Sequence, residues 1–472
     1  MTPRTWFWSG LLVSSVLCGC SAYDEKQQRK AIAVGATGTQ TKENPSHAKT
    51  ALVAAETSTT AQEAVVAAGG TVTHDLPILN SVGARLRPEN IEALSLNSDV
   101  TNIVIDAEES DGRQQEGNSS VETLHWLIQE QGSAAQNAWL DALVSKEKHG
   151  LTGHGVGIAI IDTGIAETTN HPEWRPNIVA RYDAIADREP KTLPDFTGHG
   201  THISSLIAGV DDVLQGVAPN ASIVAIKAFD SKDEANFLDL LRALQWVIAN
   251  KERYGIRVVN LSLSASAELP YHIDPLNRAL TKAWEHGLVV VVSAGNQGPA
   301  PSTVTAPGNN PWLISVGAAS AGITGEAVEV APFSGRGPTA SGHIKPNIVA
   351  PGVRLAGILP ENAERPIDEP IELTTTGLWI TSGASQASAV VAGMVTLLLE
   401  ARPDLSNNDV KCLIANTATP LGKQNQVNIP PMAQGRGLIN LTVALESTAT
   451  TCPERFENLP ANTPIEGAYL PN

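Results

Sequence analysis

Five short apolar runs between residues 155 and 319 constrain the fold of this chain more than any other feature. They read GVGIAIID (155–162), SIVAIKAFD (222–230), IRVVNLSL (256–263), GLVVVVSAGN (287–296) and WLISVGAA (312–319). Each run is rich in β-branched residues and apolar on both faces, and helix-length segments such as FLDLLRALQWVIANKERYG separate them. This pattern is typical of parallel strands buried between helices. We therefore expect an α/β fold over residues 135–448, with a parallel sheet flanked by helices on both faces.

Composition agrees with this architecture and excludes one class of partner. The chain has 472 residues, of which 42% are hydrophobic but only 4% aromatic, so the core must consist of Val, Ile, Leu and Ala. The net charge is −17, and the acidic residues are scattered without any basic stripe. Because nucleic-acid binding needs clustered Lys and Arg, we expect no nucleic-acid partner.

The N-terminus carries an export signal. Residues 1–20 contain one cation at Arg4, an apolar stretch and then small residues, and their end, LCGC, resembles the bacterial lipobox. That motif assigns a lipid to Cys20, and an ordinary signal peptide is the alternative. Residues 21–47 are polar and aperiodic, which predicts a flexible tether. The sequence therefore indicates an exported bacterial cell-envelope lipoprotein, on the outer membrane or the periplasmic face.

A small α+β unit is predicted at residues 48–106. Helical patterns at 61–68 and 91–96 alternate there with short strands around residues 72, 82–86 and 103–105. The segment 107–134 that follows is polar and acidic at its start, which makes it a linker open to proteolysis. Residues 449–472 have no periodicity and are expected to form a loosely attached tail.

Two cysteines remain after the signal. Cys412 and Cys452 are an even pair in an exported chain, and such a pair can form one disulfide in an oxidising compartment. Two reduced thiols are the alternative.

Polar residues with catalytic potential follow the apolar runs. Asp162 ends the first run in IIDTGI, and Asn296 follows the fourth in SAGNQG. His199 and His202 lie in DFTGHGTHISSLIAG, and Ser385 lies in TSGASQASAVVAG. A single DTG does not make the paired dyad of aspartic proteases, and the HxxH lacks a third ligand for zinc. We therefore expect no metal site in these motifs.

Taken together, the order Asp162, His199, Asn296, Ser385 and the segments around these residues resemble the subtilisin-like serine proteases, the subtilase family. The matching segments are IAIIDTGI, GHGTHISSLIAG, GVAP, VVNLSLS, VVSAGNQGP, FSGRGP, KPNIVAPG and TSGASQASAVVAG, and they cover essentially all of residues 150–445. The chain order Asp, His, Ser differs from that of trypsin-like proteases and α/β-hydrolases.

The resemblance implies a serine endopeptidase that needs no cofactor. It makes Ser385 the nucleophile, His199 the general base, Asp162 the residue that orients His199, and Asn296 a donor to the oxyanion. It leaves His202 as a packing or hydrogen-bonding residue. A catalytically silent subtilase fold that only binds peptides is the alternative function.

The resemblance also implies a substrate site. A protein or peptide substrate would add as a strand along Ser262, Leu263 and Ser264. Thr305 would lie at the base of the site for the residue before the cut, and because no carboxylate is placed there we expect a medium apolar preference. The acidic segment FDSKDE (229–234) would lie at the opposite rim, either as a solvated loop or as a site for basic side chains.

Finally, the unit at 48–106 resembles the subtilase propeptide, a chaperone and inhibitor of its own protease. This implies a zymogen that cuts itself within the linker. The products would be a released protease or an anchored non-covalent complex, and no processing is the third outcome. Asp211 and Asp212 offer at most a weak structural calcium site, because calcium takes six to eight oxygens.

Overall fold

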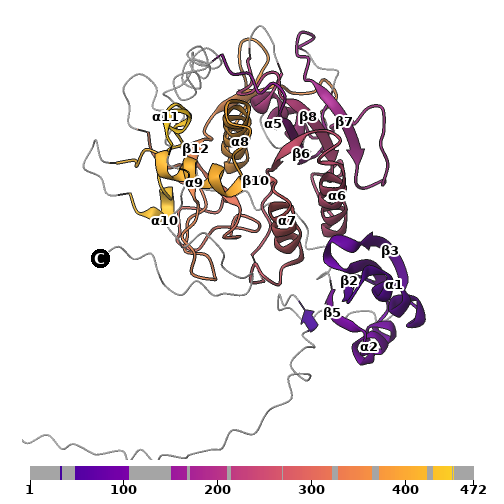
Figure 1. The fold of residues 1–472 in the computed structure, drawn as a ribbon. Helices are drawn as coiled ribbons and strands as arrows, with labels where there is room; N and C mark the ends of the chain where they lie inside the picture. Colours follow the sequence, from indigo (N-terminus) through magenta and orange to yellow (C-terminus); the bar gives the residue numbers. More distant parts are fainter. Residues whose placement is uncertain are drawn as a thin grey trace, which may run out of the picture.

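The computed structural model describes residues 32–34, 48–105, 150–166, 171–209, 214–267, 269–320, 328–363, 372–422, 429–448 and 450 (Figure 1). The predicted signal, linker and tail lie outside these ranges, apart from residue 450. So do Cys20, Asp211, Asp212 and Cys452.

A seven-stranded parallel sheet forms the centre of the molecule, in the order β12-β11-β10-β9-β6-β8-β7. Its strands are β6 (Gly157–Asp162), β7 (Ile178–Asp183), β8 (Ser222–Lys227), β9 (Ile256–Leu261), β10 (Val289–Ser293), β11 (Ile314–Ala319) and β12 (Ile348–Pro351). The five apolar runs are confirmed as β6, β8, β9, β10 and β11. These strands are buried, as expected for strands covered on both faces: this holds for every residue of β6, β10 and β11 and for the last four residues of β9.

The two edge strands were not predicted. β7 alternates buried with partly exposed residues and includes Arg181 and Asp183, so it lacks a continuous apolar run. β12 has only four residues and ends in Pro351. Edge strands bury less surface and tolerate proline, and for this reason their sequences are less distinctive.

Two pairs of helices cover the sheet (Figure 1). α5 (His199–Ile207) packs against α8 (Ala384–Ala401), and α8 crosses β9 to β12. α6 (Phe237–Asn250) and α7 (Pro275–Glu285) pack against each other on the other face. Among the described residues, α8 is the one helix long and apolar enough to cross a membrane, and 83% of it is buried inside the molecule, as in a core helix.

Smaller elements complete this part of the chain. β13 (Leu355–Gly357), β15 (Trp379–Thr381) and β14 (Glu372–Leu373) form an antiparallel sheet in that order. The C-terminal helices are α9 (Asn407–Thr417), α10 (Pro431–Gln434) and α11 (Leu441–Glu446), and α11 contacts both α8 and α9.

The N-terminal unit is a five-stranded sheet with two helices, in the strand order β1-β5-β2-β4-β3. Its elements are β1 (Ile32–Val34), β2 (Lys49–Ala55), α1 (Ser58–Ala67), β3 (Thr71–Leu76), the 3-10 turn η1 (Pro77–Leu79), β4 (Ser81–Leu86), α2 (Pro88–Leu96) and β5 (Val100–Ile105). The predicted helices and the three predicted strands are present. β2 was missed because its alanine-rich sequence holds only two β-branched residues, Thr50 and Val53. Within the predicted tether, the triplet IAV forms β1, which pairs in parallel with β5.

The two faces of this sheet have different partners. Ala51, Val53 and Ala55 of β2 pack with helix α1 in the unit's own core. The alternate residue Leu52, with Leu76, belongs instead to the main core that includes Leu238 of α6. The unit therefore buries one sheet face against its own helices and the other against the large α/β part.

Polar contacts also join the unit to α6. His74 Nε2 lies 3.0 Å from Asp239 Oδ1, and Arg242 donates to the same carboxylate. Gln245 accepts from Ile78 N (3.3 Å) and donates to Asp75 O (3.1 Å). The interface is thus apolar at its centre with a hydrogen-bonded rim, as in specific protein interfaces.

Candidate active site

The carboxyl ends of the central strands bring the predicted site residues to one edge of the sheet. Asp162 is the last residue of β6, Ser262 follows β9 directly, and Asn296 lies three residues beyond β10. His199 opens α5 and Ser385 lies in the first turn of α8. Parallel sheets place their functional groups at this edge because all strand ends and helix starts meet there.

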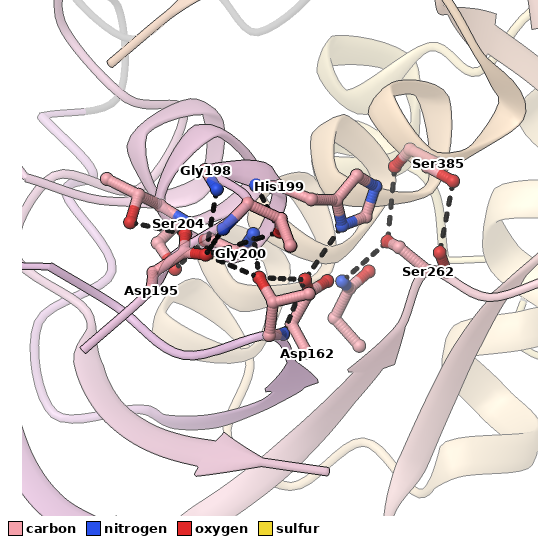
Figure 2. A network of polar contacts seen from close by, with 12 residues as sticks. Asp162, Asp195, Gly198, His199, Gly200, Ser204, Ser262 and Ser385 are labelled. Atoms are coloured by element: carbon pink, nitrogen blue, oxygen red, sulfur yellow. Dashed lines mark hydrogen bonds and ion pairs between the residues drawn. The ribbon is translucent and has the colours of Figure 1, made fainter. Parts of the chain in front are cut away.

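Asp162 and His199 form a close polar pair. His199 Nδ1 lies 2.7 Å from Asp162 Oδ1, and the two side chains are 21% and 4% exposed. The same Oδ1 accepts from Thr163 N at 2.8 Å. Figure 2 shows the imidazole with Asp162 on one side and Ser385 on the other. This arrangement fixes the proton on Nδ1 and leaves Nε2 as a base facing the nucleophile's side.

The structure distinguishes the three serines of the α8 segment. Ser385 is partly exposed, and its Oγ donates to Ser262 O at 3.0 Å (Figure 2). Ser388 is fully buried and lies 2.9 Å from both Ser262 Oγ and Ser385 O. Ser382 accepts from Arg354 N in the preceding loop (2.8 Å). Of the three, Ser385 alone combines partial exposure with a position beside Asp162 and His199.

Asn296 is held next to the start of α8. Its Oδ1 accepts from Ala384 N at 2.8 Å, which assigns the orientation of the amide and leaves Nδ2 as the donor. The first N–H groups of a helix have no partner within the helix, and they carry its positive dipole end. Asn296 Nδ2 and the Ser385 N–H are therefore suited to bind an oxyanion.

A second buried carboxylate, which the sequence reasoning missed, organises the loop before His199. Asp195 Oδ1 accepts from Thr163 Oγ1 and Gly198 N (both 2.8 Å), and Oδ2 accepts from Thr201 N and Oγ1 (2.8 and 2.7 Å). Thr163 Oγ1 in turn accepts from Gly200 N at 2.8 Å. Figure 2 shows this network running from Asp195 to Asp162. The signal in the sequence was the Asp four residues before His199, ahead of a helix start.

The electrostatics favour a charged imidazole. Burial lowers the pKa of His199, but the charge and hydrogen bond of Asp162, with smaller effects from Asp233 and Asp195, raise the pKa to about 9 overall. Asp233 belongs to the acidic loop 229–234, so charge from that loop acts on the pKa of His199. The carboxylate of Asp230 instead accepts from Lys232 N and Glu234 N within that loop.

The remaining predicted residues occupy distinct places. His202 is fully buried, lies within 3.3 Å of Leu355 O and Trp379 O, and packs edge-on against the Trp379 ring, as expected for a structural residue. The segment that follows β9 contains Ser262, Leu263 and Ser264, and the Ser264 hydroxyl is hydrogen-bonded to the Thr305 hydroxyl. Among the described residues, no group of three or more His, Cys, Asp or Glu could hold a metal ion. Cys412 is disulfide-bonded, and its expected partner Cys452 lies outside the described residues.

With this geometry established, comparison with known proteins decides the family. Residues 153–437 match the family model of the subtilase family, peptidase S8. The chain belongs to the subtilase family. It is accordingly a serine-type endopeptidase, like the serine proteases that it resembles.

The similar proteins agree with this assignment. The serine protease AprX of Bacillus subtilis (strain 168) is 34% identical over 304 residues, which are 61% of this chain and 66% of AprX, just under two thirds of that relative. Subtilisin DY of Bacillus licheniformis is 31% identical over 64% of this chain and 94% of its own. Fervidolysin from Fervidobacterium pennivorans shares the fold, with a TM-score of 0.62 and 24% identity over 86% of this chain and 62% of fervidolysin.

Proposed function

We propose that this subtilase hydrolyses peptide bonds through an acyl-enzyme on Ser385, with His199 as general base and Asp162 as its orienting partner. The observation that carries the proposal is the 2.7 Å contact between Asp162 and His199 beside the partly exposed Ser385. A silent peptide-binding scaffold has no need for such a pair, so this alternative is not favoured.

The chemistry follows from the side chains. Ser385 Oγ turns from Ser262 O to His199 Nε2, gives up its proton and attacks the scissile carbonyl. His199 then passes the proton to the leaving amine as the C–N bond breaks, while Asp162 stabilises the imidazolium. A water molecule next gives a proton to His199 and attacks the acyl-enzyme, and His199 returns the proton to Ser385 Oγ as the acid product leaves. Asn296 Nδ2 and the Ser385 N–H bind the oxyanion, and loss of one such donor typically lowers kcat about 100- to 1,000-fold.

Substitution of Ser385 tests the nucleophile directly. Ser385→Ala should abolish hydrolysis of a chromogenic peptide, whereas the neighbouring Ser382→Ala, which loses only the contact with Arg354 N, should retain it. Equal activity of wild type and Ser385→Ala would refute the assignment.

We propose further that the unit at 48–105 is an inhibitor and folding chaperone that is cut off within residues 107–134. The support is its docked position on α6 and its resemblance to subtilase propeptides. Intact-mass analysis should find the wild type cut into two chains, one of which contains this unit. The Ser385→Ala protein should remain a single uncut chain. An uncut but active wild type would contradict processing.

We also propose that the chain is exported and that a lipid is attached to Cys20. Residues 1–20 carry the signal pattern, and Cys20 is the expected lipid site on a tether that ends before the unit. Cells grown with labelled fatty acid should label the wild type and not Cys20→Ser, and the labelled protein should sediment with membranes. Unlabelled wild-type protein in the medium would indicate an ordinary signal peptide.

A further inference from the structure

Two hydroxyl groups meet next to the proposed nucleophile. Ser264 Oγ and Thr305 Oγ1 are 3.0 Å apart. Thr305 is 8% exposed and Ser264 is partly buried, so water competes little for this contact. Ser264 lies in the segment that follows β9, and Thr305 lies in the segment between β10 and β11.

Both segments flank Ser385. On one side, Ser262 O accepts from Ser385 Oγ at 3.0 Å, and Ser264 lies two residues further along. On the other side, Asn296 accepts from Ala384 N at 2.8 Å, and Gly295 directly precedes Asn296. The side chain of an acyl group on Ser385 would therefore enter between Ser264 and Gly295.

The Thr305 side chain already occupies that space. A Cβ added to Gly295, whose φ is +93°, would lie 2.4 Å from Thr305 Oγ1 and 2.9 Å from Thr305 Cγ2. Thr305 thus lies directly against the Gly295 backbone while its hydroxyl reaches Ser264 on the opposite side.

The backbone holds Thr305 in this position. Thr305 N donates to Ala294 O (3.2 Å), and the next residue, Ala306, exchanges two 2.9 Å hydrogen bonds with Ala265. Backbone hydrogen bonds therefore join the segment that carries Thr305 to Ala294 on one side and to Ala265 on the other. A large side chain entering here would have to move a threonine fixed at both ends and separate two paired hydroxyls.

We propose that the pair Ser264–Thr305 closes the subsite for the substrate residue on the N-terminal side of the cut, and that the enzyme selects Gly, Ala or Ser there. This rests on the proposed function and narrows the medium apolar preference expected from sequence. A serine substrate side chain has the further option of hydrogen-bonding to the hydroxyl pair.

The test is a series of peptides that differ only at that residue, with Gly, Ala, Ser, Leu and Phe, measured as kcat/KM on the processed enzyme. The wild type should favour Ala over Leu and Phe by at least about tenfold, the discrimination that one or two excluded methylenes give. Thr305→Gly and Ser264→Gly should raise the ratio of kcat/KM for the Leu and Phe peptides to kcat/KM for the Ala peptide by about tenfold or more. Thr303→Ala removes a hydroxyl that donates to Ala300 O and accepts from Arg336 N, outside this pair; it is the control and should keep the wild-type preference.

The outcomes separate this proposal from the proposed function. Equal hydrolysis of Phe, Leu and Ala peptides by the wild type would overturn the closed subsite and leave the protease assignment intact. Hydrolysis of none of the peptides, together with no reaction with a fluorophosphonate, would overturn the function itself. If one glycine variant fails to fold, the other decides, and a preference unchanged in the folded variant counts against the pair.

Discussion

His199 carries most of the electrostatic information at the residue scale. Its pKa of about 9 means that the free enzyme holds a protonated imidazole at neutral pH, and only the neutral form can take the Ser385 proton. The folded pKa lies above the ordinary 6.5. The interaction with Asp162 therefore contributes its full stability below pH 6.5 and loses it as the pH rises through 9.

The first prediction concerns this titration. kcat/KM should rise with pH and reach half its maximum near pH 9. Asp233→Asn removes one of the negative charges that raise the pKa, so the midpoint should move to lower pH, whereas Glu234→Gln in the same loop should leave it in place. A midpoint that is the same in wild type and Asp233→Asn would show that the loop charge does not reach His199.

The second prediction concerns Asp195 as a positioning residue. The carboxylate of Asp195 accepts at least four hydrogen bonds. Asp195→Asn replaces one of its two oxygens by an NH₂ group that cannot accept, so the loop before His199 should shift. We expect kcat to fall about a hundredfold with KM nearly unchanged, and the pH midpoint to fall as well. Asp187→Asn, which alters the part-buried hydrogen bond from Tyr182 and none of the contacts of Asp195, is the control. A change confined to thermal stability would reduce Asp195 to a structural residue.

At the element scale, the sequence predicts what is locally encoded. β6 and β10 are recognisable because burial on both faces makes each a continuous apolar run, whereas the edge strands β7 and β12 are not. The proposed catalytic residues Asp162, His199 and Ser385 lie in sequence motifs at strand and helix ends. The Asp195 network and the Ser264–Thr305 contact join residues from separate segments, so only the folded chain brings them together.

The third prediction tests the docking of the N-terminal unit on α6. A Cβ at Gly83 would lie 2.7 Å from Leu238 Cδ1 and 3.0 Å from His74 Cβ, so Gly83→Leu should push the sheet away from the helix. In the uncut Ser385→Ala protein, hydrogen exchange should increase at Ile78 N and along α6. Leu96→Ala, at a residue that is 78% exposed, should leave exchange unchanged. Unaltered exchange in Gly83→Leu would mean that this contact does not hold the unit.

At the scale of the whole molecule, buried lysines make stability depend on pH. Burial lowers the pKa of Lys411 from 10.5 to about 7, and its Nζ donates to the carbonyl oxygens of Pro311 and Trp312. Between these pH values the unfolded chain binds a proton that the folded chain does not. The contribution of Lys411 to stability therefore rises with pH from 7 to 10.5.

The fourth prediction follows from that sign. In the Ser385→Ala background, Lys411→Met should be more stable relative to its parent at pH 7 than at pH 10, by about 2 kcal/mol or more. Urea unfolding at both pH values measures the difference, with the partly exposed Lys251→Met as control. A difference that does not change with pH would show that Lys411 keeps its ordinary titration.

The fifth prediction concerns metal ions. None of the proposed catalytic steps uses a metal, so EDTA should leave kcat unchanged. A calcium-reversible fall in thermal stability would instead support a weak structural site that includes Asp211 and Asp212.

The central claim is that Ser385 is the nucleophile, and covalent labelling tests it most directly. The processed wild-type enzyme should gain the mass of one fluorophosphonate group, located on Ser385 by peptide mapping, and Ser385→Ala should gain none. A label on Ser382 or Ser388, or equal labelling of the Ser385→Ala protein, would contradict the account.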